Sequence, residues 1–190
     1  MNGAVLKTDR LLLRPFDLEC DLEAFHRNIM ADPQVMQFLG GVKTPDETKD
    51  FLAQRARIPQ LGQPGLWAIT LKNDEANEAV GYVGFLAQEL DGDPVEELSY
   101  RLTSGLWGQG LAREAAFAAR NWFFKHTSQD MFVGFILPEN LPSIAVAERI
   151  GMWYWKDAVV KGFGVRVYRL EQRSHTSRER GSEQDCRQSY

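Results

Sequence analysis

The sequence predicts a mixed α/β domain of the α+β kind, with one mostly antiparallel sheet of seven strands flanked by about four helices. Two observations support this prediction. Strand-like runs outnumber helical ones, and several are separated only by short polar turns, which favours antiparallel neighbours. Between residues 95 and 138, a strand, a glycine-rich loop, a helix and a further strand follow one another, which is the pattern of a parallel crossover.

The first half of the chain supplies one strand, two helices and a hairpin. The run RLLLRPF (10–16) is dense enough in apolar residues for a buried strand. Helical spacing of apolar residues then predicts a first helix, at Leu22, Phe25, Ile29 and Met30. A second helix is expected over 44–58, because Thr44 can cap it, with Pro45 at its first position and Glu47 three residues after the cap. The runs 66–72 and 79–90 flank the polar turn NDEANE and predict an antiparallel hairpin.

The second half alternates strands with helices and ends in a polar segment. In chain order we expect a strand at 95–102, a helix at 110–126, a strand at 131–138, a helix at 140–151 and two final strands at 152–160 and 164–170. Residues 171–190 contain almost no apolar side chains and are expected to form a disordered tail. The folded unit is therefore expected to be a single domain over residues 1–170.

Composition restricts the class of protein. The chain has 190 residues, of which 44% are hydrophobic and 25% charged, so it can bury a core without disulfides. Its net charge of −4 argues against a general nucleic-acid binder. Cys20 and Cys186 are far apart in the sequence, and no apolar run has the length of a signal peptide or a membrane span. We therefore expect a cytoplasmic protein with neither a nucleic-acid nor a membrane partner.

The stretch GLWGQGLA (105–112) places three glycines directly before a helix. A Walker loop is disfavoured, because Leu111 and Ala112 stand where lysine and a metal-binding hydroxyl are needed. A Rossmann fingerprint is disfavoured because Arg113 replaces the third glycine. The remaining pattern is a pyrophosphate held by backbone N–H groups at a helix N-terminus, from Gly108 to Arg113.

At these residues the chain resembles the GNAT N-acetyltransferases, and within them the branch that includes the ribosomal-protein N-terminal acetyltransferases. The resemblance covers about residues 5–170. It rests on three segments in order, which are LKTDRLLLRPF, EELSYRLTSGLWGQGLAREA and NLPSIAVAERIGM. One departure is Gly105, which stands where the family often has Gln or Arg.

The resemblance implies acetyl-coenzyme A as the acyl donor. Its pyrophosphate would contact the N–H groups of Gly108, Gln109, Gly110, Leu111, Ala112 and Arg113. Its pantetheine arm would lie along strand 97–102 and pair with backbone near Tyr100 and Leu102, where that strand separates from strand 131–138. Asn140 would contact the cofactor, and it can also serve as the N-cap of its own helix.

The acceptor of the acetyl group has to be a free amine, and amines are largely protonated at neutral pH. A base should therefore assist, and Glu97 is our first candidate, because it matches an acidic position common in the family. Glu96 is the second candidate. Adjacent residues of a strand face opposite ways, so only one of the two can point into the cleft. Both could instead be solvated residues at the start of a strand.

The leaving thiolate needs a proton or a stabilising donor. Many family members use a tyrosine seven residues after the asparagine, and here that position is Ala147. Ser143 could donate to the sulfur, or it could bond back to its own helix. Tyr154 is a weaker candidate, and the thiolate could also leave unassisted.

These residues predict an N-acetyltransferase that moves an acetyl group from acetyl-CoA to a primary amine by direct attack in a ternary complex. The acceptor could be a protein N-terminus or a small amine, recognised by residues 20–62. The alternative is a non-catalytic acyl-CoA sensor or scaffold, which the missing tyrosine favours. The three histidines are scattered in the sequence, so no metal is expected. A predicted edge strand near the C-terminus is compatible with a homodimer.

Overall fold

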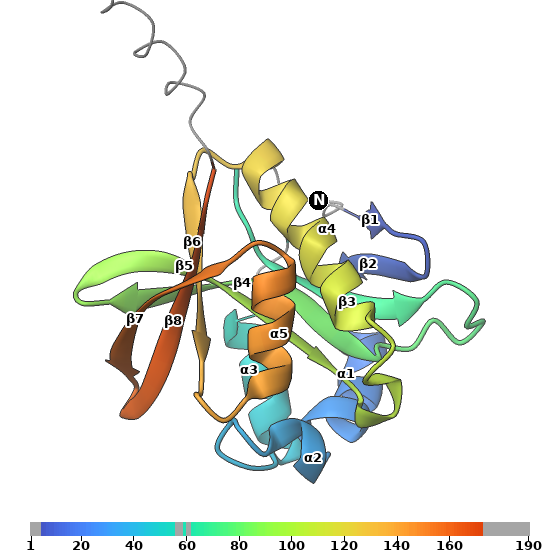
Figure 1. Cartoon of the computed structure of the whole chain (residues 1–190). Coiled ribbons are helices and arrows are strands. Elements are labelled where there is room, and N and C mark those ends of the chain that lie inside the picture. The colour runs from blue at the N-terminus through green and yellow to red at the C-terminus, as the bar shows by residue number, and fades with distance from the viewer. Residues whose placement is uncertain (1–4, 56–58, 60–61, 173–190) are drawn as a thin grey trace, which may run out of the picture.

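The computed structural model describes residues 5–55, 59 and 62–172, which form one sheet with helices packed on it (Figure 1). The strand order is β1-β2-β3-β4-β5-β6-β8-β7. Every neighbouring pair is antiparallel except β5 and β6, which are parallel. The mixed, mostly antiparallel fold predicted from the sequence is therefore confirmed.

The bounds of the elements follow the sequence prediction closely. The strands are β1 (Leu6–Lys7), β2 (Leu11–Pro15), β3 (Leu66–Leu71), β4 (Gly81–Leu90), β5 (Asp93–Leu102), β6 (Met131–Ile136), β7 (Trp153–Val160) and β8 (Phe163–Glu171). The α-helices are α1 (Leu18–Phe25), α2 (Pro33–Met36), α3 (Pro45–Arg55), α4 (Leu111–His126) and α5 (Leu141–Arg149). The π-helical turn η1 covers His26–Met30, and the 3₁₀ turn η2 covers Ser104–Leu106.

Two counts differ from the prediction. The described sheet has eight strands rather than seven, because Leu6 and Lys7 pair with β2. Two residues are too few to show a period of two in the sequence. The helix count differs because the Asp32 side chain accepts hydrogen bonds from the N–H groups of Gln34 and Val35 and starts an additional short helix, α2, after the predicted first helix. The predicted first helix is α1 continued by the π-helical turn His26–Met30.

The helix predicted over 44–58 begins as expected. The Thr44 hydroxyl accepts from the Glu47 N–H, and the Glu47 carboxylate accepts from the Thr44 N–H, which is a complete capping box. The helix α3 that follows ends at Arg55. Residues 56–58 of this prediction, and the predicted tail from residue 173, including Cys186, lie outside the described residues.

The helices cover the two faces of the sheet. On the α4/α5 face, α4 and α5 pack over Phe85, Leu98 and Leu102. On the α1–α3 face, the helices α1, α2 and α3 pack over Tyr82 and Leu86. Figure 1 shows α4 and α5 on the near side of the sheet and α1 and α3 behind it. Within this described part of the chain, no helix has the length and apolar character needed to cross a membrane.

The sheet opens in its middle. Strands β5 and β6 are paired at Glu97 and Val133, with no further pair in the register. Beyond this point β5 runs to the glycine-rich loop and α4, whereas β6 runs to α5. The divergence leaves one edge of β5 without a neighbouring strand over its last residues, which creates space between β5 and α5.

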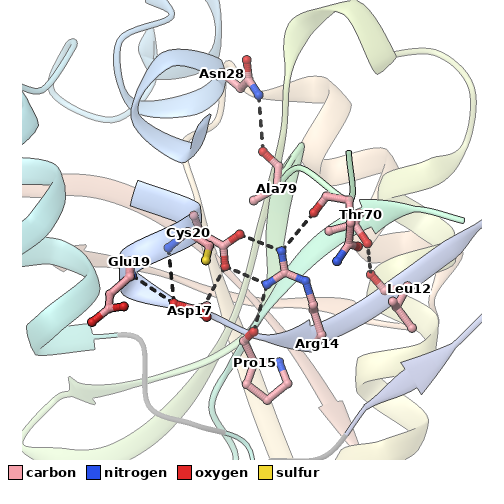
Figure 2. A network of polar contacts seen from close by, with 11 residues as sticks. Leu12, Arg14, Pro15, Asp17, Glu19, Cys20, Asn28, Thr70 and Ala79 are labelled. Atoms are coloured by element: carbon pink, nitrogen blue, oxygen red, sulfur yellow. Dashed lines mark hydrogen bonds and ion pairs between the residues drawn. The ribbon is translucent and has the colours of Figure 1, made fainter. Parts of the chain in front are cut away.

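A buried ion pair fixes the α1–α3 layer to the sheet. Arg14 of β2 donates to both carboxylate oxygens of Asp21 in α1, at 2.6 and 2.7 Å. The side chains are only 17% and 3% exposed, respectively. The hydrogen bond to Asp21 raises the pKa of Arg14. Figure 2 shows Arg14 reaching from its strand towards the start of α1, where Asp17 caps the helix.

Candidate active site

A cleft of about 530 Å³ lies at the opening of the sheet. Its walls are the end of β5, the glycine-rich loop, the start of α4 and the first turns of α5, and α2 and the segment after it form the far end. The sequence-predicted residues Tyr100, Leu102, Asn140 and Ser143 all line it, as does the whole stretch from Gly108 to Arg113. The fold therefore brings together all of the residues predicted to bind the cofactor.

The glycine-rich loop turns through a conformation that favours glycine. Gly108 has φ +76° and Gly110 has φ +77°, which side chains other than glycine rarely adopt. The N–H groups from Gly108 to Arg113 have no acceptor among the described residues, and the first backbone bond of α4 runs from the Glu114 N–H to the Gly110 carbonyl. These free donors sit at the positive end of the α4 dipole, which suits an anion.

An anchor from the N-terminal strand region holds this loop. Arg10 donates from Nη1 to the Gln109 carbonyl at 2.9 Å and from Nε to the Glu114 carboxylate at 2.7 Å. Thr8 donates its hydroxyl to the same carboxylate at 2.6 Å. Burial raises the pKa of Glu114, but the donors from Thr8 and Arg10 outweigh it and hold this pKa below its usual value.

This anchor was not predicted from the sequence. Its signal was the presence of Thr8 and Arg10 in one of the three family-like segments, LKTDRLLLRPF. Nothing local pairs residues that are more than 90 positions apart, so only the folded sheet reveals the contact.

The free edge of β5 presents backbone groups to the cleft. The Thr103 N–H donates to the Val80 carbonyl beside β4, and alternate residues of a strand point to opposite edges. The backbone of Tyr100 and Leu102 is therefore directed away from β4, towards the opening. The Leu102 carbonyl already accepts a 2.9 Å hydrogen bond from the Trp107 indole, so the backbone groups left at this edge are those of Tyr100 and the Leu102 N–H.

Helix α5 closes the other side of the cleft. The Asn140 side chain accepts from the Ser143 N–H at 3.2 Å, which makes Asn140 the N-cap. The Tyr100 hydroxyl donates to the Ser143 carbonyl at 2.9 Å and bridges β5 to α5, and burial raises the pKa of Tyr100. Among the described residues, the Ser143 hydroxyl has no hydrogen-bond partner, and Ser143 lines the cleft.

The other two acid positions lie away from the cleft. Ala147 is 1% exposed and belongs to the core under α5, so a small residue there serves packing. Tyr154 lies on β7, where its ring contacts Tyr168, and it does not line the cleft.

The two candidate bases face opposite sides of β5, as the sequence predicted. Glu97 lies on the α1–α3 face, opposite Leu86, and accepts a 2.6 Å hydrogen bond from Gln88. Glu96 is 8% exposed and lies on the α4/α5 face, in line with Leu98. Neither carboxylate is among the described residues that line the cleft, and both assignments stay predictions.

Two groups of cleft residues were not predicted. Gln34, Gln37, Phe38 and Leu39 bring α2 and its following turn to the far end of the cleft, and Arg101 lines it from β5. The first four lie within the range 20–62 expected to recognise the acceptor, but none of them was predicted individually. The available signal was that residues 97, 99 and 101 are all polar in a strand whose even positions are mostly apolar. Which of these polar side chains reach a cleft depends on the helices that pack over them.

A helix N-terminus with free amides, beside the unpaired edge of a strand, defines a class of proteins that hold phosphate-bearing ligands. A family model described as an acetyltransferase (GNAT) domain matches residues 10–153. The chain therefore belongs to the GNAT acetyltransferase family, whose members are acetyl-CoA-dependent acyltransferases.

Individual relatives agree with this family. The uncharacterized protein YkkB of Bacillus subtilis (strain 168) is 30% identical over 151 residues, which cover 80% of this chain and 86% of YkkB. An acetyltransferase structure from Agrobacterium tumefaciens str. C58 has a TM-score of 0.72 and 29% identity, and the match covers 90% of this chain and 96% of that one.

A more distant structure shares the fold. The ribosomal L7/L12 alpha-N-protein acetyltransferase RimL, in complex with coenzyme A, has a TM-score of 0.72 at 20% identity, with 89% of this chain and 98% of RimL covered. The described residues of this chain contain no group of three or more His, Cys, Asp or Glu arranged to hold a metal.

Proposed function

We propose that this protein transfers the acetyl group of acetyl-CoA to a primary amine by direct attack in a ternary complex. The observation that carries this proposal is the run of free N–H groups from Gly108 to Arg113, placed at the edge of a cleft whose other wall is the unpaired edge of β5. The pyrophosphate of the cofactor needs N–H donors such as those at the start of α4. The amide-containing arm next to it needs backbone partners such as those on the unpaired edge of β5.

The described residues fit the cofactor. Backbone amides and the α4 dipole would bind its pyrophosphate without a lysine or a metal. Arg113 and Arg149 also line the cleft and would supply positive charge to its phosphates. The backbone of Tyr100 would pair with the pantetheine arm. Asn140 lines the cleft and would contact the cofactor.

Acetyl-CoA supplies an activated thioester carbonyl. In the transfer, the amine nitrogen forms a bond to the acetyl carbon, the carbon–sulfur bond breaks, and the electron pair of that bond leaves with the sulfur as thiolate. Glu97 would take the proton from the amine, directly or through a water molecule. Glu97 lies on the α1–α3 face of β5, opposite the face of Tyr100 and Leu102. A backbone N–H of β5 would donate to the carbonyl oxygen as negative charge develops on it.

Ser143 is the residue that would donate a hydrogen bond to the thiolate, and the proton that the base takes from the amine balances the one that the sulfur finally acquires from solvent. Its hydroxyl is free of hydrogen bonds within the described structure, and it lines the cleft on the side of α5. The buried Ala147 leaves no acid at the usual family position. The acceptor stays within the class of primary amines, either a protein N-terminus or a small molecule, since the structural neighbours include a protein alpha-N-acetyltransferase and an aminoglycoside acetyltransferase.

The experiment combines a binding assay and a release assay. Calorimetric titration with CoA should show binding, and a thiol-release assay with acetyl-CoA should show acceptor-dependent release for at least one amine in a panel of small amines and peptides. Binding without release for any acceptor would favour a non-catalytic acyl-CoA sensor. Absence of CoA binding would refute the proposal as a whole.

A further inference from the structure

Arg101 occupies an unusual environment for a charged side chain. Its guanidinium lies over the rings of Tyr82 and Phe51, at 5.3 and 5.9 Å from their centroids. Its Nη1 approaches the sulfur atoms of Met36 and Met30, at 3.4 and 3.5 Å. These neighbours are apolar or weakly polar, so they hold the guanidinium in place without neutralising its charge.

No carboxylate in the described part of the chain forms an ion pair with Arg101. A guanidinium has five N–H donors, and thioether sulfurs are weak acceptors. A half-buried cation in such a setting pays a desolvation cost that a partner anion normally offsets. Because Arg101 also lines the cleft, that partner can be a ligand.

The charges of the cleft point the same way. Its described lining contains three arginines, Arg101, Arg113 and Arg149, and no aspartate or glutamate. This is unusual for a chain with a net charge of −4. Arg113 lies in the first turn of α4, where the cofactor phosphates are expected, and Arg149 is the last residue of α5.

Arg101 lies on the opposite side. Its neighbours Tyr100 and Leu102 face α4 and α5, whereas Arg101 packs against residues of η1, α2, α3 and β4 on the α1–α3 face. Adjacent residues of a strand alternate between faces, so the Arg101 guanidinium lies on the face away from the α4/α5 layer. That separation favours an anion of the acceptor over a cofactor phosphate as its partner.

We propose that Arg101 binds a carboxylate of the acceptor, so that the preferred substrate is a primary amine that also carries a carboxylate. This inference rests on the proposed acetyl transfer. The planar fork of the guanidinium matches the two oxygens of a carboxylate, and the rings beneath it fix its plane. Gln34 and Gln37, at the same end of the cleft, can contribute further neutral donors.

The test uses matched acceptors on the full-length protein. Glycine, β-alanine, 4-aminobutyrate and 5-aminopentanoate are each compared with the corresponding carboxamide at saturating acetyl-CoA, with rates expressed per concentration of neutral amine. We expect at least one acid to exceed its amide by roughly tenfold to a hundredfold in kcat/KM, mainly through KM, since hydrogen bonds to charged groups have about this strength.

Variants assign the preference to Arg101. Arg101→Met removes the charge and should reduce the acid-to-amide ratio to about one, whereas Arg101→Lys should keep part of it. Arg27→Met is the control, since Arg27 pairs with the exposed Glu78 outside the cleft and its loss should leave the ratio unchanged. CoA affinity should be the same in all of these proteins.

Several outcomes would overturn the inference. Amides used as well as acids throughout the series would do so, as would an acid preference that survives in Arg101→Met, or a preference confined to phosphoethanolamine over ethanolamine. If no amine is acetylated, the proposed function fails, and the site is then tested alone by titrating the CoA-loaded protein with N-acetyl-β-alanine and its amide. Equal affinity for the two, or no binding of either, would refute the carboxylate site.

Discussion

The two faces of strand β5 are built in different ways. On the α4/α5 face, the cleft offers main-chain donors from one continuous stretch, Gly108 to Arg113, and glycines allow the chain to turn there. On the α1–α3 face, the cleft offers side chains such as Arg101, placed by helices that are 50 to 70 residues away. A site made of main chain can be read from local composition, whereas a site made of converging side chains cannot.

The largest expected effect concerns chemistry on the α1–α3 face. Glu97→Gln should lower kcat/KM for the acceptor by about 10²- to 10⁴-fold, the usual range for loss of a general base, and leave CoA affinity nearly unchanged. Steady-state kinetics and CoA titration check this. Glu96→Gln, on the other face of β5, is the matched comparison and should keep its turnover per folded molecule. If CoA affinity collapses in Glu97→Gln while turnover per bound cofactor survives, the base assignment is wrong.

The next prediction concerns the buried ion pair that holds the α1–α3 layer on the sheet. Asp21→Ala leaves Arg14 buried without its counter-charge and should lower the free energy of unfolding by about 3–5 kcal/mol. Urea denaturation measures this change. Glu78→Gln breaks the exposed pair with Arg27 and should cost less than about 1 kcal/mol. Equal losses in the two variants would show that the buried pair has no special role in fixing α1.

A third substitution affects only the main-chain site. Gly110→Val forces a β-branched residue to φ +77°, with a strain of about 1–3 kcal/mol, so CoA affinity should fall by roughly tenfold or more. Gly105→Ala is the control, because Gly105 does not have a positive φ and a Cβ there meets nothing within 4 Å. Titration with CoA distinguishes them, and a Gly110→Val protein with wild-type affinity would contradict the proposed pyrophosphate site.

A smaller effect is expected at the anchor of the loop. Arg10→Met removes the hydrogen bonds to the Gln109 carbonyl and to Glu114, and it should raise the Kd for CoA by roughly twofold to tenfold. The effect is modest because the Arg10 side chain is half exposed. Acceptor KM should not change. A selective rise in acceptor KM would mean that the two faces are coupled through the loop.

The smallest effect is a dependence of stability on pH. The pKa of Glu114 in the folded protein is below its usual value, so its ionised form stabilises the fold at pH values above about 4.3. This contribution is lost as the pH falls through the folded pKa. Denaturation from pH 7 to pH 3 should therefore show that the stability advantage of wild type over Glu114→Gln shrinks on acidification. A constant difference would contradict the role of Glu114.

The difference between the two faces also explains which predictions from the sequence succeeded. The hairpin of β3 and β4, the cap of α3 and the α4 crossover were all predicted, because each depends on residues within about 30 positions of one another. The stretch from Gly108 to Arg113 was predicted for the same reason. The strand β1 was not predicted, because two residues are too few to show a period of two. The helix α2 was not predicted either, because it has only four residues and its start depends on the cap that Asp32 supplies.

Contacts between distant segments escaped prediction for a physical reason. Arg10 and Gln109 meet because β2 lies near the start of α4 in the assembled sheet, and neither residue carries a local signal of that neighbour. Arg101 was visible in the sequence only as a polar residue on one face of a strand. The aromatic rings and sulfur atoms that surround the Arg101 guanidinium belong to four separate elements of the fold.

The sequence alone determined the family-like glycine turn, the order of strands and helices along the chain, and the alternation that separates Glu96 from Glu97. These features follow from local backbone preferences and from the period of two along a strand. Only the tertiary structure decided which side chains converge on the cleft. The described lining that results contains arginines and no carboxylate. Convergence depends on packing between segments that are far apart in the chain, and no local preference encodes that.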